Sequence, residues 1–205
     1  GDIAIDTAPT MSVSAFLLQT KDPVLQDVRV RRAIANAIDT AEIATAITKD
    51  TATPNASIVP TPSSYYSKAQ GARIKPDAAL AKKLLAEAGY RGQPIKILTN
   101  KRYGPMYDAA VLGQAMLQQV GVNAELEVLE WATQLDRYLK GDYQMMAFSY
   151  SARLDAALNY EMMSGPKATQ PRKIWDNAEA LKLLDEAMVV ADRARRQAIF
   201  DQLHG

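Results

Sequence analysis

An arginine and an aspartate two positions apart are the residues of this sequence best placed to do chemistry. Arg153 and Asp155 directly follow the apolar run 143–150, which has the character of a buried strand. A guanidinium group can bind a carboxylate through two hydrogen bonds, and a carboxylate can act as an acid, a base or a helix cap. The pair therefore permits three interpretations: a solvated turn, a catalytic pair, or the rim of a ligand site.

Two other loops carry similar residues after strand-like runs. Arg102 and Tyr103 follow the run at 95–100, and Trp131 follows the alternating run at 122–130. Aromatic rings beside arginine suit a small organic ligand that bears a carboxylate, because the planar guanidinium matches carboxylate geometry. The predicted ligand-binding residues are Arg102, Tyr103, Trp131, Tyr150, Ser151, Arg153 and Asp155. Arg153 is the strongest of these candidates.

Structural roles compete with ligand binding for most of these residues. Trp131 lies on the apolar face of its predicted helix and could pack into the core. Arg102 stands in a polar loop and could simply be solvated. Tyr103 and Tyr150 could pack at the ends of strands, and Asp155 could equally cap the segment that follows it.

Catalytic and metal-binding motifs are weak throughout the sequence. The single histidine, His204, is one residue from the end, so a Ser–His–acid arrangement would depend on a fraying terminus. Residues 164–167 match S-x-x-K, but Gly165 and Pro166 favour a turn where that motif needs the start of a helix. There is no cysteine and no glycine-rich phosphate loop. We therefore expect no catalytic centre, no metal and no cofactor.

The composition is that of an ordinary globular protein. The chain has 205 residues, of which 48% are hydrophobic and 23% charged. No apolar run approaches the length needed to span a bilayer. Lysine and arginine exceed aspartate and glutamate by one, and the densest basic run, 29–32, is interpreted as the solvated face of a helix. The charge therefore gives no reason to expect a nucleic-acid partner, and the lack of cysteine leaves the compartment open.

Alternating strand-like and helical patterns predict the elements that position these loops. Strands are expected at 11–18, 95–100, 122–130 and 143–150, and helices at 27–38, 76–90, 106–120, 131–142 and roughly 175–191 and 193–203. A short further helix after Asp39 should carry Ile43 and Ile47. The last three strands alternate with helices, so they should be parallel, with right-handed crossovers. The fold class is therefore α/β with a mainly parallel sheet flanked by helices. Its candidate loops should meet at the carboxyl edge, where open α/β sheets bind ligands.

Several helix ends and one long loop can also be predicted. Asp39 and Asp192 are expected N-caps, Pro76 should lie near a first helical turn, and Gly89 should end that helix. The proline-rich segment 51–76 should be a long loop, either a surface connector or a functional loop. One apolar face of the 131–142 helix should comprise Trp131, Leu135, Tyr138 and Leu139.

The segment 19–39, QTKDPVLQDVRVRRAIANAID, resembles a recurring segment of the peptide/nickel class of extracellular solute-binding proteins of ABC importers. In that family a strand ending near Asn-Thr leads into a D-x-R-V-R helix. Here Asp27, Arg29 and Arg31 match, while Gln19 and Thr20 replace the Asn-Thr pair. Similar segments follow in the family's order at 52–60, 76–90, 116–131 and 138–155.

The resemblance implies a periplasmic-binding-protein-like (type II) lobe. Residues 1–205 would be a single α/β domain, the C-terminal ligand-binding lobe of a longer two-lobe protein. Gly1 in place of an initiator methionine indicates that either a signal has been removed or the chain is a piece of a longer protein. The resemblance implies that the N-terminal lobe and any secretion signal are missing from it. The family also implies a monomer, periplasmic or extracellular and membrane-associated, that delivers a small solute to a membrane permease.

In peptide-binding members of the family, an aspartate in the loop after the third strand pairs with the free amino group of the ligand. Aligned outward from Tyr150, that position carries Arg153, while Asp155 matches a second pattern, W-S-G-R-x-D-P-D, with Ala156 in place of proline. The reversed charge favours a ligand with an anionic group. The leading hypothesis is thus a lobe that captures a peptide or peptide-like solute. The alternatives are a hydrolase-like enzyme domain that uses Asp155 as acid or base, and an interaction module.

Overall fold

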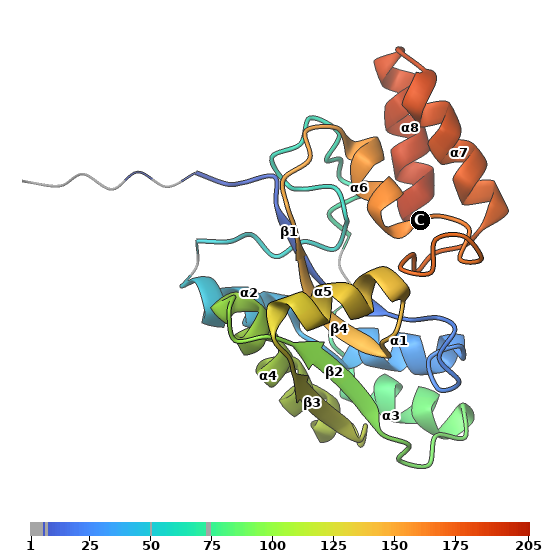
Figure 1. Cartoon of the computed structure of the whole chain (residues 1–205). Helices are drawn as coiled ribbons and strands as arrows, with labels where there is room; N and C mark the ends of the chain where they lie inside the picture. Colours follow the sequence, from blue (N-terminus) through green and yellow to red (C-terminus); the bar gives the residue numbers. More distant parts are fainter. Residues whose placement is uncertain (1–5, 7, 50, 73–74) are drawn as a thin grey trace, which may run out of the picture.

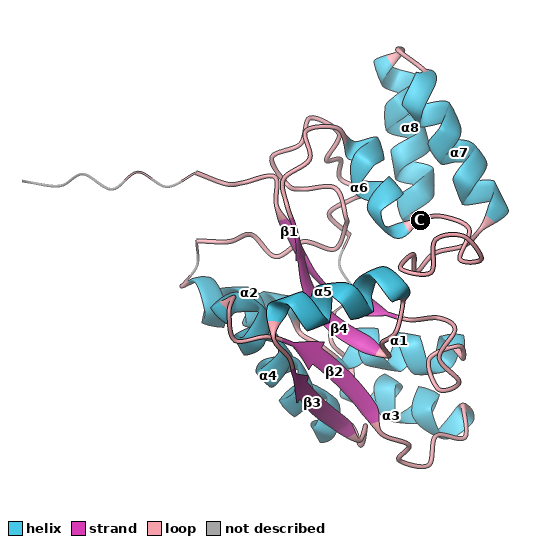
Figure 2. Cartoon of the chain, in the orientation of Figure 1, coloured by secondary structure: helices cyan, strands magenta, loops and turns pink. Residues whose placement is uncertain are grey.

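In the computed structural model, which describes residues 6, 8–49, 51–72 and 75–205, four strands form one sheet in the order β1-β4-β2-β3 (Figures 1 and 2). The strands are β1 (Val13–Leu18), β2 (Ile95–Thr99), β3 (Ala124–Val128) and β4 (Met145–Tyr150). Strand β2 pairs in parallel with both β3 and β4, whereas β1 pairs antiparallel with β4. The predicted α/β class with a mainly parallel sheet is therefore confirmed, and its outer strand β1 runs the other way.

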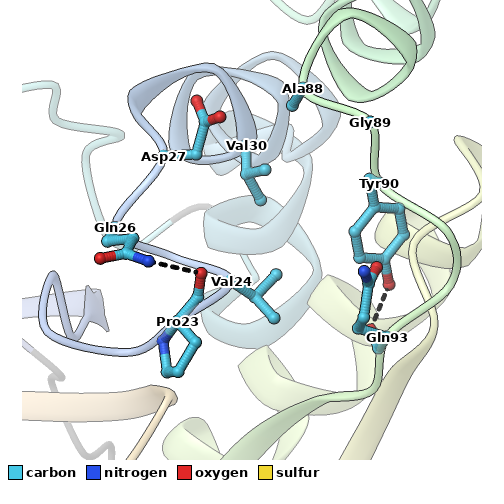
Figure 3. A pocket seen from close by; sticks show the side chains of 9 residues that line it. All are labelled: Pro23, Val24, Gln26, Asp27, Val30, Ala88, Gly89, Tyr90 and Gln93. Carbon is cyan, nitrogen blue, oxygen red and sulfur yellow. Dashed lines mark hydrogen bonds between the residues drawn. The ribbon is translucent and has the colours of Figure 1, made fainter.

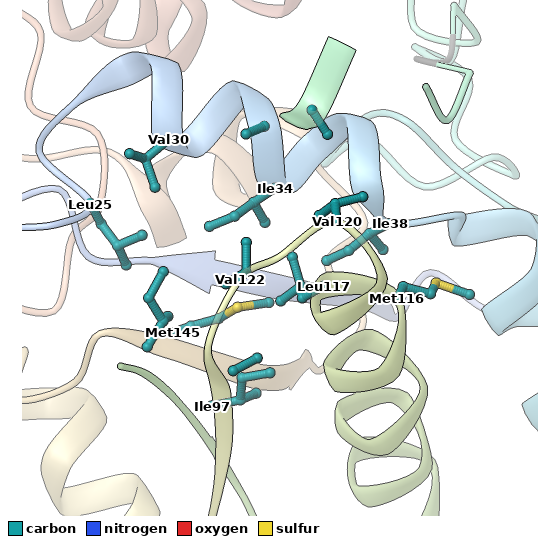
Figure 4. Close-up of a cluster of buried hydrophobic side chains, with 14 of the residues drawn as sticks. Leu25, Val30, Ile34, Ile38, Ile97, Met116, Leu117, Val120, Val122 and Met145 are labelled. Carbon is teal, nitrogen blue, oxygen red and sulfur yellow. The ribbon is translucent and has the colours of Figure 1, made fainter. Parts of the chain in front are cut away.

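The alternation of side chains along β4 divides the core into two layers. Met145 and Ala147 pack into a cluster with α1 (Val28–Ala37), α2 (Thr40–Thr48), α3 (Ala78–Glu87) and α4 (Gly104–Gln119). Figure 4 shows part of this cluster. Met146, Phe148 and Tyr150 point to the opposite face, where α5 (Trp131–Lys140) covers them. Both faces of β4 are buried, as its continuous apolar sequence predicts.

A second packing centre lies beside the sheet, where α6 (Ala156–Met163), α7 (Ala178–Val189) and α8 (Arg193–His204) come together (Figure 1). The long loop contributes to it: Val59 is fully buried, and Gln70 Nε2 donates to the carbonyl of Phe200 at 2.8 Å. The described residues of the 51–76 segment contain no helix or strand, as expected. They are nevertheless packed against α8 rather than loosely connecting two elements.

Most of the predicted helix ends are found in place. Asp39 accepts hydrogen bonds from the amides of Ala41 and Glu42, and Asp192 accepts one from the amide of Arg195. Gly89 follows α3 with a φ of +70°. Pro76 lies near the first turn of α3, as predicted, directly before the N-cap residue Asp77.

Two predictions about helices are wrong. The helix expected to start at 175 begins at Ala178, because the side chain of Asn177 caps its first turn. Leu139 was expected on the apolar face of α5, yet it is 53% exposed. Gln134 is fully buried in its place, because the buried face of α5 runs through Gln134 and Tyr138.

The segment 164–177 crosses the turn between α5 and β4 and fastens the second packing centre to the sheet. Gln19 Nε2 donates to the carbonyls of Gly141 and Pro171, both at 3.3 Å, and Lys167 Nζ donates to Gln19 Oε1 at 2.9 Å. Gly141 has a φ of +67°, and a Cβ atom at this position would overlap the carbonyl of Pro171. This crossing therefore requires glycine for two reasons, its backbone conformation and the close approach of another chain segment.

Replacing Gly141 with alanine should therefore destabilise the protein more than the same change at Gly89. Both residues have positive φ, but no atom lies within 4 Å of a Cβ built at Gly89. We expect Gly89→Ala to cost about 1 kcal/mol from backbone conformation alone. Gly141→Ala should cost about 2–4 kcal/mol, because the steric overlap adds to it. Urea denaturation of both variants measures the difference, and equal losses would contradict the role assigned to the crossing.

Candidate functional site

The carboxyl ends of β2, β3 and β4 bring the three predicted loops to one edge of the sheet. The amide of Leu129, just past β3, donates to the carbonyl of Thr99 at the end of β2, at 2.9 Å. Strand β4 ends at the same edge, because it runs parallel to β2. The loops 100–103, 129–130 and 151–155 therefore form one surface, as the βαβ pattern predicts.

Aromatic side chains form a continuous row along this edge. The rings of Tyr103 and Trp131 meet edge to face with centroids 5.0 Å apart, and Trp131 stacks on Phe148 at 5.9 Å. Phe148 in turn contacts Tyr138 at 4.4 Å and Tyr150 at 5.1 Å. The row thus joins three predicted site residues through two rings, Phe148 and Tyr138, that the sequence did not single out as site residues.

The row changes from exposed to buried along its length. Tyr103 is 40% exposed and Trp131 is half-buried, whereas Tyr150 is only 6% exposed. Burial raises the pKa of the Tyr150 hydroxyl, and the neighbouring Tyr138 raises it further. Tyr150 therefore stays neutral at physiological pH and packs at the end of its strand. The surface available to a ligand is the Tyr103–Trp131 end.

A buried amide network holds this edge together, and the sequence analysis missed it. Asn100 and Gln134 are both fully buried, and Asn100 Nδ2 donates to Gln134 Oε1 at 2.8 Å. Gln134 Nε2 donates to the carbonyl of Ala147 at 3.0 Å, and Asn100 Oδ1 accepts from the amide of Tyr103. The network connects β2, β4 and α5 and fixes the backbone that carries Tyr103. The sequence carries only a weak signal for this network. Asn100 stands at the end of a strand, and Gln134 interrupts the apolar face of a later helix.

The remaining polar candidates lie on the outside of the edge. The guanidinium of Arg102 lies over the ring of Tyr103, 5.8 Å from its centroid. Ser151 is exposed, and Arg153 is partly exposed. Arg153 Nη1 donates to the carbonyls of Ser151 and Ala152, at 3.5 and 3.2 Å. Within the described ranges no carboxylate forms an ion pair with Arg153.

Asp155 caps a helix, which was one of the two interpretations that the sequence left open for it beside ligand contact. Its side chain caps α6 by accepting from the amide of Ala157 at 2.9 Å. Nη2 of Arg196 also donates to both of its carboxylate oxygens, at 2.7 and 2.9 Å. The expected helix cap is therefore confirmed. A carboxylate engaged by a guanidinium and a backbone amide is poorly placed to exchange protons with a substrate.

Two depressions in the described surface lie at the opposite edge of the sheet. One of about 460 Å³ is lined by residues around Val24, Val30 and Tyr90 (Figure 3), and one of about 250 Å³ lies by Gly141–Gln144 at the start of β4. None of the seven candidate residues lines either depression. Among the described residues, no group of three or more His, Asp or Glu side chains could hold a metal ion. Likewise, the helices of that part of the chain are too short or too polar to cross a membrane.

Comparison with known proteins gives a consistent family. The family model of bacterial extracellular solute-binding proteins, family 5 Middle, matches residues 1–171. A probable deoxycholate-binding periplasmic protein, YgiS, of Escherichia coli K12 is 26% identical over 95% of this chain and 37% of its own length. The oligopeptide-binding protein OppA of Bacillus subtilis is 22% identical over all of this chain and 39% of its own length.

Solved structures show the same fold. The ABC transporter-associated periplasmic binding protein DppA of Helicobacter pylori, in complex with the peptide STSA, superposes with a TM-score of 0.85 at 25% identity. The match covers 96% of this chain and 40% of that protein. The fold is thus that of a type II periplasmic-binding-protein lobe, and the chain spans well under half the length of these relatives. All three are described as binding proteins, which favours the binding hypothesis over the enzyme alternative.

Changing Gln134 to methionine should weaken the edge by removing the centre of the amide network. Methionine keeps the length of the side chain, but it removes the donor to the carbonyl of Ala147 and leaves Asn100 Nδ2 with only the weak acceptor Sδ of Met106, at 3.4 Å. We expect a loss of about 2 kcal/mol, since an unsatisfied buried polar group costs about 1–3 kcal/mol. Gln202→Met makes the same chemical change at an exposed position of α8 and should be near neutral. Urea denaturation provides the comparison, and similar stabilities for the two variants would argue against the network.

Proposed function

Because the chain belongs to the bacterial extracellular solute-binding proteins of family 5, we propose that it is the ligand-binding lobe of the substrate-binding component of an ABC importer. It would capture a peptide or peptide-like solute at the carboxyl edge of its sheet. The relatives named for oligopeptides and for a bound peptide support this ligand class. The ligand-loaded protein would then dock on a membrane permease, from the periplasm or the outer face of the membrane.

The partner surface for this edge would be a second lobe of the same protein. The relatives are more than twice as long as the matched segment, which leaves room for such a lobe. Residues 1–205 would then be the C-terminal lobe, one α/β domain of a monomeric two-lobe protein. The pairing of Val13 with Tyr150 brings the start of β1 to the candidate edge. This position of β1 would suit a segment that crosses between the two proposed lobes.

The proposed binding mode rests on one observation, the lack of a described carboxylate partner for Arg153. Among the described residues its guanidinium is held by two backbone carbonyls alone, those of Ser151 and Ala152. A cation in this state can form a charge-assisted hydrogen bond with an anionic ligand group. Tyr103 and Trp131 would provide a flat apolar contact, and Arg102 and Ser151 further polar contacts. The relative named for deoxycholate, an organic anion, is consistent with an anionic ligand.

Arg153→Ala should therefore weaken binding of the natural ligand without unfolding the protein. We first identify the ligand that co-purifies with the full-length protein by native mass spectrometry, and then measure its affinity calorimetrically. A loss of about 10-fold or more is expected, because a hydrogen bond to a charged group contributes about 1.5–3 kcal/mol. Arg32→Ala, on the exposed face of α1, should bind as the wild type does.

Unchanged affinity of Arg153→Ala would remove this residue from the site. The enzyme alternative predicts a different result, namely turnover of the ligand that is lost in Asp155→Asn. Detecting such turnover would contradict the binding role.

The 205-residue chain by itself should bind the ligand much more weakly than the full-length protein. In the proposed arrangement a second lobe supplies part of the site, and such a site buries most of the ligand only when both lobes are present. Calorimetry on the chain and on the full-length protein, side by side, measures the difference. Submicromolar binding by the chain alone would contradict the two-lobe arrangement.

A further inference from the structure

The loop that carries Arg153 is attached to the rest of the protein through Asp155. Ser151, Ala152 and Leu154 are exposed, and Leu154 retains 86% of its surface. Arg153 itself contacts the carbonyls of its own loop. Asp155 is the first residue after β4 whose side chain bonds to a distant element. The position of Arg153 therefore depends on how Asp155 is held.

Arg196 of α8 holds Asp155 from 41 residues further along the chain. Besides donating to both carboxylate oxygens, its guanidinium donates through Nε to the carbonyl of Ala187 at 3.0 Å, and through Nη1 to the hydroxyl of Tyr65 at 3.1 Å. It also lies over the rings of Tyr65 and Phe200, 5.1 and 5.4 Å from their centroids. One side chain thus joins the loop at 151–155 to α7, to α8 and to the long 51–72 loop.

The environment of Arg196 makes this attachment rigid. Its side chain is only 14% exposed, whereas the side chain of Asp155 is 42% exposed. Every donor nitrogen of the guanidinium has an acceptor, and the aromatic rings limit its rotation. By contrast, the neighbouring Arg195 pairs with Glu186 on the surface with a side-chain exposure of 48%. The two arginines are adjacent in sequence and both pair with a carboxylate. Arg196 pairs with Asp155 at the candidate edge, whereas Arg195 pairs with Glu186 of α7.

We propose that Arg196 is a positioning residue for ligand binding, which holds the loop at 151–155 through Asp155 so that Arg153 faces the ligand. This inference rests on the proposed function, because it assigns a purpose to the Arg153 loop. It also explains why the second packing centre matters to the site. The guanidinium of Arg196 joins the 51–72 loop and α7 to the loop at 151–155.

Hydrogen–deuterium exchange of the ligand-free full-length protein tests the attachment directly. Arg196→Gln should raise the exchange rate of amides at 151–157 by about 10-fold or more, while the amides of β2 and β4 stay protected. Arg196→Lys, which keeps a positive charge, should restore part of the protection. Arg195→Gln is the matched control and should leave these amides unchanged. Unaltered exchange in Arg196→Gln, or equal changes in both glutamine variants, would overturn the proposal.

Binding measurements distinguish positioning from a general loss of structure. The probes are the peptide Ser-Thr-Ser-Ala and deoxycholate, and any probe that binds the wild type is used. Arg196→Gln should weaken binding, and the double variant with Arg153→Ala should bind no more weakly than Arg153→Ala alone, because both changes remove the same contact. Additive losses, or wild-type affinity in Arg196→Gln, would overturn the positioning role. If the wild type binds neither probe, the proposed ligand class is wrong, and the exchange result still decides whether Arg196 orders the loop.

Discussion

The pairing of β4 on both sides is the constraint on which the rest of this structure depends. The strand runs antiparallel to β1 and parallel to β2, and both of its faces are buried. One face supports the layer formed by α1 to α4, and the other supports α5 and the aromatic row. Because the parallel direction is set at β4, the loops after β2, β3 and β4 must emerge at one edge. The candidate site is a consequence of that direction.

Two sets of polar contacts hold the candidate edge in place: a buried amide network and a guanidinium from the second packing centre. Asn100 and Gln134 satisfy each other and a strand carbonyl in a region without water access, so neither can move alone. Arg196 gives the Arg153 loop a similar anchor. The ligand binding proposed for this edge would benefit from such preorganisation, because less conformational entropy would be lost on binding.

The placement of charge at the edge is also informative. Asp155 is neutralised by Arg196 inside the lobe, whereas Arg153 meets no described carboxylate. The anionic group of Asp155 therefore has a cationic partner among the described residues, whereas the cationic group of Arg153 has no anionic one. This asymmetry accords with an anionic ligand group, and it follows from the partner of Asp155, which lies far away in the sequence.

Local spacing in the sequence was sufficient to predict most of the elements, the helix caps Asp39 and Asp192, and the edge of the sheet at which the candidate loops lie. Helical and strand periodicities report which face of an element is buried, and a cap such as Asp39 bonds within three residues of itself, so both can be read from neighbours along the chain. The antiparallel placement of β1, the burial of Gln134 and the packing of the 51–72 loop could not be read in this way. Nor could the pairing of Asp155 with Arg196. These features join segments separated by many residues, and their partners are decided by how the elements cross in space.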